Sequence, residues 1–198
     1  IAMHYKDIAF MGFWEVITNL DKILKNIKFC KKDILNYKPD TIIFIDYPGF
    51  NMRIAKWAKQ NNITTQYYVS PQIWAWKENR IKSIKRDIDH LYVILPFEKE
   101  FYENKHNFKV DFVGHPLIDA INTFEYQDEE SFKADNKLLD KPIIALLPGS
   151  RKQEIQKMLA IMMQMATNFK EYQFVIAGAP GLTKADYQPF LQKNNMLL

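Results

Sequence analysis

The stretch Thr41-Ile42-Ile43-Phe44-Ile45-Asp46 decides how this chain folds. It is short, apolar and rich in β-branched residues, which predicts a strand that is buried on both faces. The strand closes on a carboxylate, and Pro48-Gly49 then predict a turn. Residues 50–61 predict a helix that stops at Asn61-Asn62. This strand–turn–helix unit sets the pattern for the residues on either side of it.

The same alternation continues along the chain. Before the strand, apolar residues recur at three- and four-residue steps and predict a helix over residues 12–37, which Pro39 ends. The further expected elements are strands at 63–69, 89–95 and 110–113 and helices at 77–86 and 97–105. Strands that alternate with helices pair in parallel through right-handed crossovers. The sequence therefore predicts an α/β fold with a doubly wound, Rossmann-like sheet.

Ligands of such a sheet bind outside the carboxyl ends of its strands. The residues that follow the predicted strands here are Asp46, Ser70, Pro96 and Gly114. A ligand site is therefore expected at this edge of the sheet.

The chain changes character after residue 121. Residues 122–141 are acidic and polar around Asp128-Glu129-Glu130, which predicts a linker or a loosely packed helix between domains. The expected elements after it are a strand at 142–147, a helix at 152–168 and a strand at 172–177. We expect one Rossmann-like domain over 1–121 and the start of a second over 142–198. Neither end of the sequence looks natural, so we expect a fragment.

The composition is that of a globular protein in a reducing compartment. Apolar residues make up 47% and charged residues 25%, which excludes disorder of the whole chain. The single cysteine, Cys30, has no partner for an intramolecular disulfide. The net charge of +4 is too small to indicate nucleic-acid binding. The sequence contains no signal peptide and no apolar run of membrane-spanning length.

Several enzyme classes lack their motifs in this chain. No Walker loop, GxGxxG, HExxH or GxSxG pattern occurs, which argues against an ATPase, a classical dehydrogenase, a zincin and a serine hydrolase. Asp87-Ile88-Asp89 matches the Asp-x-Asp pattern of metal-dependent glycosyltransferases, but it lies where a helix enters a strand, at the wrong edge of the sheet. No histidine has a partner at metal-ligand spacing. We predict no metal and no cofactor.

Six segments, in order and at similar spacing, resemble the lipid-A-disaccharide synthase family. They are Met11–Val16 (MGFWEV), Ile45–Asn51 (IDYPGFN), Tyr68–Trp76 (YVSPQIWAW), Leu95–Tyr102 (LPFEKEFY), Val113–Leu117 (VGHPL) and Leu146–Arg151 (LLPGSR). Each is weak alone, but six in the family's order form a specific signal. The resemblance covers nearly the whole chain, with the linker as its least similar part.

The resemblance implies an inverting glycosyltransferase of the B type, with two Rossmann-like domains and the active site between them. The first domain would hold the acceptor, 2,3-diacylglucosamine 1-phosphate (lipid X), and the second the donor, UDP-2,3-diacylglucosamine. The products would be UDP and lipid A disaccharide 1-phosphate, in lipopolysaccharide biosynthesis. The implied location is the cytoplasmic, anionic face of the inner membrane of a Gram-negative cell. The sequence does not give the oligomeric state.

The chain departs from the family's pattern in three places. It lacks the family's N-terminal glycine-rich loop and the C-terminal segments that carry most nucleotide contacts, so we expect this fragment by itself to be inactive. Many relatives have Asp where this chain has Gly49. Asp46 is therefore the only carboxylate in this turn.

The resemblance favours Asp46 as the general base that accepts the proton of the acceptor hydroxyl. The alternative is an Asp that only stabilises the turn. Arg151, together with Gly149 and Ser150, would bind the diphosphate of the leaving UDP at the start of a helix. The alternative is an N-cap serine with a surface arginine. Glu154 either orients Arg151 or is an ordinary first-turn carboxylate.

Two further groups of residues are candidates. The residues expected at the substrate cleft are Glu15, Asn51, Ser70 and His115. The residues expected to contact the membrane or lipid phosphate, or else to fill the core and form a solvated helix face, are Trp74, Trp76, Lys77 and Arg80. A lone histidine such as His115 is more often structural, and the resemblance makes a substrate contact an equal alternative.

Two other functions stay open at this point. The first is another B-type glycosyltransferase that uses UDP-N-acetylglucosamine in cell-wall synthesis, and its acceptor would distinguish it. The second is a non-catalytic module that binds lipid or nucleic acid through a basic face. The segment Ser70–Trp76 favours the disaccharide synthase over the first. The acidic residues near the middle of the chain give the second little support, and we expect no nucleic-acid partner.

Overall fold

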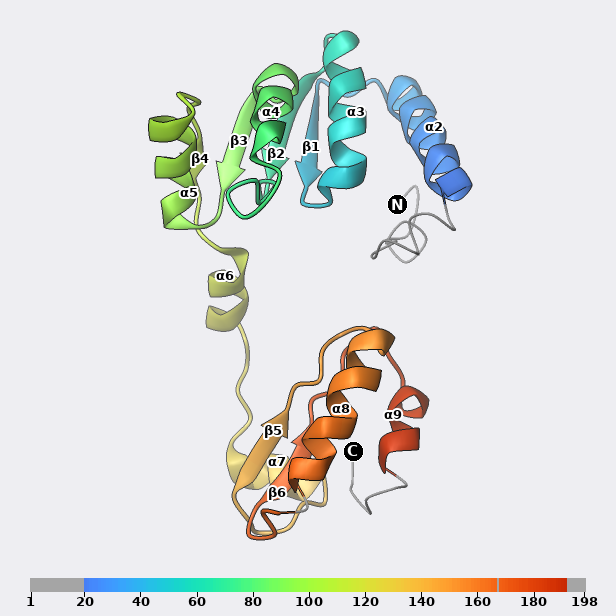
Figure 1. The fold of residues 1–198 in the computed structure, drawn as a ribbon, viewed down its shortest axis with the longest axis vertical. Coiled ribbons are helices and arrows are strands. Elements are labelled where there is room, and N and C mark those ends of the chain that lie inside the picture. Colours follow the sequence, from blue (N-terminus) through green and yellow to red (C-terminus); the bar gives the residue numbers. More distant parts are fainter. Residues whose placement is uncertain (1–19, 167, 192–198) are drawn as a thin grey trace. The chain divides into compact units, whose positions relative to one another are not determined.

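A computed structural model describes residues 20–166 and 168–191 of the chain. The chain divides into two compact units, residues 1–124 and 125–198 (Figure 1). Each unit has its own sheet and its own hydrophobic core. We describe the two units separately.

The first unit contains a four-stranded sheet. Its strands are β1 (Thr41–Ile45), β2 (Thr64–Tyr68), β3 (His90–Val93) and β4 (Asp111–Phe112). They pair in parallel in the order β1-β2-β3-β4. The predicted α/β fold with a parallel sheet is confirmed. Because all four strands run the same way, the loops that follow them meet at one edge.

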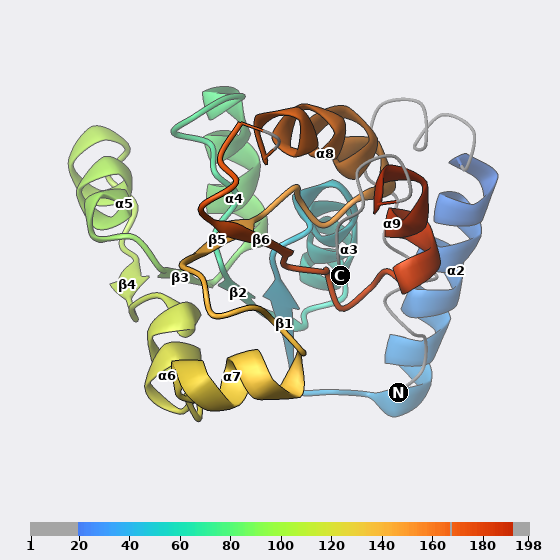
Figure 2. The ribbon, with the colours of Figure 1, turned by 90° about the horizontal axis from the view of Figure 1, so that it is seen from below.

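The helices of the first unit alternate with its strands in sequence, with one helix before β1 and one after β4. They are α2 (Leu20–Tyr37), α3 (Pro48–Gln60), α4 (Ile81–Asp87), α5 (Pro96–Glu100) and α6 (Pro116–Asn122). Figures 1 and 2 show α3 and α4 on the same side of the sheet, with α2 beside α3. The other side of β1 is open: Ile43 and Ile45 are 59% and 60% exposed. Our prediction that this strand is buried on both faces is therefore wrong, because the described helices cover only one face.

The predicted helices differ from the structure in detail. A 3₁₀ turn, Glu78–Arg80, precedes α4, and a π-helical turn, Phe101–Lys105, follows α5. The helix α6 was not predicted at all. The expected helix over 12–37 is confirmed from Leu20 onward, and residues 12–19 lie outside the described part of the chain.

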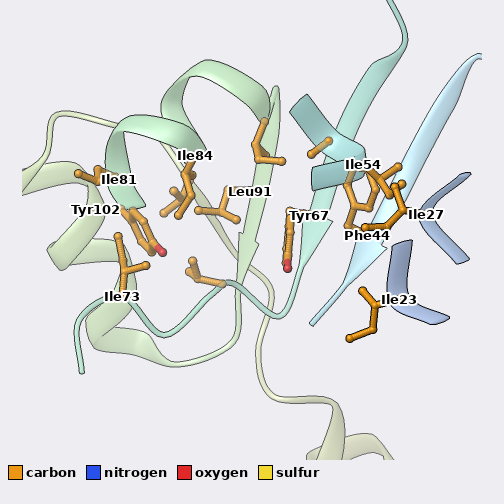
Figure 3. Close-up of a cluster of buried hydrophobic side chains, with 14 residues drawn as sticks. Ile23, Ile27, Phe44, Ile54, Tyr67, Ile73, Ile81, Ile84, Leu91 and Tyr102 are labelled. Carbon is orange, nitrogen blue, oxygen red and sulfur yellow. The ribbon is translucent and has the colours of Figure 1, made fainter. Parts of the chain in front are cut away.

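The core of the first unit joins α2, α3 and α4 to the covered face of the sheet. Figure 3 shows Ile23 and Ile27 near Phe44 and Ile54, and Leu91 near Ile84. The register aligns the inward side chains across the sheet, with Phe44 opposite Tyr67 and Tyr67 opposite Leu91. This alternation of buried and exposed residues fixes which side chains reach the helices.

Both carboxylates of the Asp87-x-Asp89 pattern have partners within the protein. Asp87 is buried and forms an ion pair with Arg86 at 2.6 Å. Asp89 pairs with Lys59 and accepts hydrogen bonds from the amide and hydroxyl of Thr65 at 3.0 and 3.1 Å. Burial opposes ionisation of Asp89, but these contacts hold its pKa below the usual value. These two residues therefore connect β2, β3 and α3 at the amino edge of the sheet.

The second unit is smaller. The parallel strands β5 (Ile143–Leu146) and β6 (Gln173–Ile176) are joined through α8 (Lys152–Ala166), and α7 (Glu129–Asp135) and α9 (Lys184–Leu191) complete it. Its core contains Leu146, Ile155, Leu159, Met163, Ile176 and Tyr187. Asp186 caps the turn at Thr183 and pairs with Lys152 at 2.7 Å, and the hydrogen bond from Lys152 lowers its pKa to about 2. The helix α9 was not predicted.

Leu91→Ala should destabilise the first unit by about 2–5 kcal/mol, because Leu91 is 1% exposed and its removal leaves a cavity. All four tryptophans of the chain lie within residues 1–124, so their fluorescence during urea unfolding reports on this unit. Leu117→Ala is the matched control, since Leu117 is 58% exposed and should change stability by less than about 0.5 kcal/mol. Equal effects of the two variants would contradict this core.

Candidate functional site

The carboxyl edge of the first sheet carries unusual backbone conformations. Asp46 and Tyr47 after β1 have φ of 44° and 45°, and Val69 after β2 has φ of 59°. This region is uncommon for residues other than glycine and is an outlier for a β-branched residue such as valine. Each such residue costs about 1–3 kcal/mol and persists only where the surroundings hold it. This edge is therefore a candidate functional site.

The backbone of Asp46 is held on both sides. Its amide donates to the Tyr68 carbonyl at 3.1 Å. Its carbonyl accepts hydrogen bonds from the Tyr67 hydroxyl and the Asn51 amide, each at 2.6 Å. Asn51 also donates to the Ile45 carbonyl at 3.1 Å, so this predicted cleft residue braces the turn.

The side chain of Asp46 is exposed. Within the described residues its carboxylate makes no hydrogen bond and no ion pair. Burial raises the pKa of Tyr67, and the Asp46 charge adds to this rise while Arg80 opposes it. Tyr67 therefore stays protonated and donates to the Asp46 carbonyl. The arrangement fixes the backbone of Asp46 and leaves its carboxylate open to a ligand.

A buried carboxylate, Glu98, organises the neighbouring loops. It is 1% exposed. Its Oε1 accepts from the Ser70 hydroxyl at 2.8 Å and from the Trp74 indole N–H at 3.2 Å. Its Oε2 accepts from the amides of Ile94 and Leu95 at 3.1 and 2.9 Å. Glu98 thus joins the loop after β2 to the loop after β3.

Glu98 is not among the functional residues predicted from the sequence. The signal was present, because Pro96 at the first position of a helix and Glu98 at the third are typical of a helix start. The Ser70 hydroxyl is engaged with this carboxylate and Ser70 is buried, so its direct contact with a substrate stays a prediction. Trp74 also packs edge-on against Phe97 at 4.9 Å between ring centroids.

Trp76 lies at the surface of the same loop. It is 57% exposed. Lys77 Nζ lies 4.5 Å from the centre of its ring, and the Arg80 guanidinium carbon lies 5.4 Å from it. Both cations lie within the distance at which the face of an aromatic ring attracts a positive charge. The structure therefore groups three of the predicted membrane-contact residues, and their contact with a membrane stays a prediction.

A pocket of about 250 Å³ lies at this edge, between α3 and α4. Its lining residues are Pro48, Gly49, Met52, Arg53, Pro71, Arg80, Ser83 and Ile84. A larger hollow of about 400 Å³ lies at the amino edge, around Lys59, Asp89 and His90. Since parallel sheets bind ligands at their carboxyl edge, the smaller pocket is the better candidate for a binding site.

His115 forms the N-cap of α6. Its Nδ1 accepts a hydrogen bond from the Leu117 amide at 3.1 Å, so the neutral ring carries its proton on Nε2. Gly114 before it has φ of 84°, which favours glycine. His115 therefore has a structural role, and its contact with a substrate stays a prediction.

In the second unit, Glu154 occupies the start of α8. Its Oε2 accepts from the amides of Ser150 and Arg151 at 3.0 and 3.2 Å, and its Oε1 accepts from Arg151 Nη1 at 3.2 Å. Gly149 has φ of 106°, and a Cβ there would lie 2.8 Å from the Glu154 Cβ. We expected these two amides to form an anion site. In this structure a carboxylate of the chain binds them, so their contact with a diphosphate stays a prediction. Glu154 also orients Arg151.

Three expectations concern other parts of the chain. Glu15 lies outside the described residues. Among residues 20–166 and 168–191, no group of three or more His, Cys, Asp or Glu side chains is placed to hold a metal ion. The helices of the same residues are all too short or too polar to cross a bilayer.

Comparisons with known proteins show which family the chain resembles. A family model described as lipid-A-disaccharide synthetase matches residues 1–197. The chain is 43% identical over 188 residues to a lipid-A-disaccharide synthase of Coxiella burnetii. These residues are 93% of the chain and 50% of the relative. The identity to the synthase of Trichlorobacter lovleyi is 40% over 192 residues, 94% of the chain and 49% of the relative. The identity to the synthase of Geobacter sulfurreducens is 35% over 196 residues, which are 96% of the chain and 50% of the relative. The chain spans about half the length of the curated relatives it matches.

Glu98→Gln should destabilise the first unit. An amide NH₂ cannot accept a hydrogen bond, so one pair of donors loses its acceptor at a cost of about 1–3 kcal/mol for each buried donor. Urea unfolding followed by tryptophan fluorescence measures the change. Glu100→Gln, on the exposed side of the same helix, should change stability by less than about 0.5 kcal/mol. A Glu98 variant as stable as the Glu100 variant would show that the four hydrogen bonds do not hold these loops.

Proposed function

Because the chain belongs to the lipid-A-disaccharide synthetase family, we propose that this protein transfers a diacylglucosamine unit from UDP-2,3-diacylglucosamine to 2,3-diacylglucosamine 1-phosphate. The reaction forms a bond from the acceptor hydroxyl oxygen to the anomeric carbon of the donor. It breaks the bond from that carbon to the diphosphate and releases UDP. The family relationship, together with the open carboxylate of Asp46 at the carboxyl edge of the sheet, supports this proposal.

Asp46 is the proposed general base. The acceptor hydroxyl loses its proton as it attacks, and a carboxylate within hydrogen-bond reach can accept that proton. The three hydrogen bonds to the Asp46 backbone restrict where its carboxylate can lie. A base with a fixed backbone requires less reordering when the acceptor binds.

Arg151 is the proposed stabiliser of the leaving UDP. Negative charge grows on the diphosphate as the bond to the sugar breaks, and a guanidinium is planar and always charged. The diphosphate would share or replace the Glu154 carboxylate at the amides of Ser150 and Arg151. This role for Arg151 requires no metal or other cofactor.

The remaining assignments complete the proposal. The fold is the two-domain B type, with the acceptor in the first domain, over 1–121, and the nucleotide in the second, from 142 onward. Asn51, Ser70, His115 and Glu15 lie near the substrates. The reaction takes place at the cytoplasmic face of the inner membrane, where Trp76 and Lys77 contact anionic lipid. Their exposed ring and ammonium group are suited to that interface.

Asp46→Asn should lower kcat by about 10²- to 10⁴-fold, because the amide cannot accept the proton. The assay uses the full-length protein with both lipid substrates and a chelator, and it follows the disaccharide by mass spectrometry. Asp40→Asn, an exposed carboxylate just before β1, is the matched control and should leave the rate unchanged. Near-normal turnover by a folded Asp46→Asn protein would remove the proposed base.

Arg151→Gln should lower kcat by about 10²- to 10³-fold, as for the loss of one donor to a developing charge. Arg151→Lys should recover only part of this rate, since it keeps the charge but loses the planar fork. Lys157→Gln, on the exposed surface of α8, is the control. If Arg151→Gln and Lys157→Gln had the same kcat, Arg151 would have no part in stabilising UDP.

A further inference from the structure

We propose that the pocket between α3 and α4 binds the phosphate monoester of the acceptor sugar, with Arg53 and Arg80 as its ligands. This inference rests on the proposed function and extends it, because it assigns a site to one chemical group of one substrate. Three properties of the pocket support it: its charge, its size and its place beside Asp46.

The pocket is positively charged. Arg53 and Arg80 both line it, and none of its described lining residues is acidic. In the part of the chain that the structure describes, neither arginine forms an ion pair with a carboxylate. The Ser83 hydroxyl adds a donor, and the start of α3 at Pro48-Gly49 adds the partial positive charge of a helix N-terminus. Two arginines without a carboxylate partner, in one concave site, form a setting that attracts a dianion.

The size of the pocket limits what enters it. Its volume of about 250 Å³ is at or below the low end of ligand pockets, which run from roughly 300 to 1,000 Å³. A phosphate group with part of one sugar suits this volume, whereas the acyl chains of a diacylated sugar require another surface. The pocket therefore fits the head group and not the whole lipid.

The pocket adjoins the proposed base. Pro48 and Gly49 line it and follow Asp46 by two and three positions in the same tight turn. Tyr67 connects the two features, because its hydroxyl donates to the Asp46 carbonyl at 2.6 Å and lies close enough to Arg80 to feel its charge. A sugar whose phosphate lies on the arginines would thus extend toward the turn that carries Asp46. One acceptor molecule can contact both.

Trp76 positions Arg80. Its ring lies 5.4 Å from the guanidinium carbon, and this cation–π contact leaves the N–H groups of Arg80 in the plane of the guanidinium able to donate. Pro71, from the loop that Glu98 holds, forms part of the same wall. The loop after β2 therefore contributes one lining residue, Pro71, to the pocket.

The first experiment measures binding without the reaction. The full-length protein is titrated with glucosamine 1-phosphate, with inorganic phosphate and with glucosamine, and binding is followed by NMR. Glucosamine 1-phosphate should bind most tightly. Arg53→Gln and Arg80→Gln should each weaken it about tenfold or more, which corresponds to the loss of one charged hydrogen bond. Lys82→Gln, an exposed cation on the same helix that does not line the pocket, should leave binding unchanged.

The second experiment uses turnover on two acceptors, diacylglucosamine with and without its 1-phosphate. Arg53→Gln and Arg80→Gln should lower kcat/KM about tenfold or more for the phosphorylated acceptor. They should leave kcat/KM for the other acceptor within about twofold, because the pocket contacts only the phosphate. Arg53 is exposed, so its variant keeps the test valid if the Arg80 variant is less stable.

Several results would overturn the inference. One is an equal loss of kcat/KM on both acceptors, and another is unchanged binding of glucosamine 1-phosphate in both arginine variants. A third is inorganic phosphate that binds as tightly as the sugar phosphate, which would identify a general anion pocket. If the wild-type protein transfers to neither acceptor, the proposed function fails. The titration then still decides separately whether the pocket binds the sugar phosphate.

Discussion

The carboxyl edge of the first sheet depends on one buried carboxylate. Glu98 is removed from water, and a charge in that position is tolerated only if its oxygens are hydrogen-bonded. Four donors from the loops after β2 and β3 meet this requirement. The hydrogen bonds that satisfy Glu98 are the same ones that fix Ser70 and Trp74. The hydrogen bonds that this buried carboxylate requires therefore fix the shape of the loop after β2.

Because these loops are held in place, the carboxyl edge of the sheet can keep residues with an unfavourable, positive φ. Val69 and Asp46 both have positive φ, and each lies within one residue of a hydrogen-bonded anchor: Ser70 on Glu98, and Asp46 through Tyr67 and Asn51. Rigid surroundings of this kind hold conformations that a free loop would leave. The result is an exposed carboxylate and an adjoining basic pocket on rigid loops, an arrangement that suits the proposed transfer.

Much of this architecture was accessible before the structure. Short apolar runs and 3.6-residue patterns predicted every strand of both sheets and most helices, because each of these patterns lies within a short segment of the sequence. The expectation failed where tertiary contacts decide. The apolar run of β1 predicted two covered faces, but helices cover one. The short helices α6 and α9 carry too few apolar repeats to stand out. The motif Gly149-Ser150-Arg151 predicted an anion site, and the structure shows its amides bound by the side chain of Glu154, three residues after Arg151.

The sequence by itself determined the fold class, the family and the identity of the candidate base, since these depend on local pattern and on ordered motifs. Only the tertiary structure decided which polar residues are already engaged. Ser70 and Asn51 look equally available in a sequence, yet one is buried on Glu98 and the other braces Asp46. The pocket of Arg53 and Arg80 joins residues 27 positions apart, on different helices. Such a juxtaposition arises because parallel strands bring distant loops to one edge, and no local pattern records it.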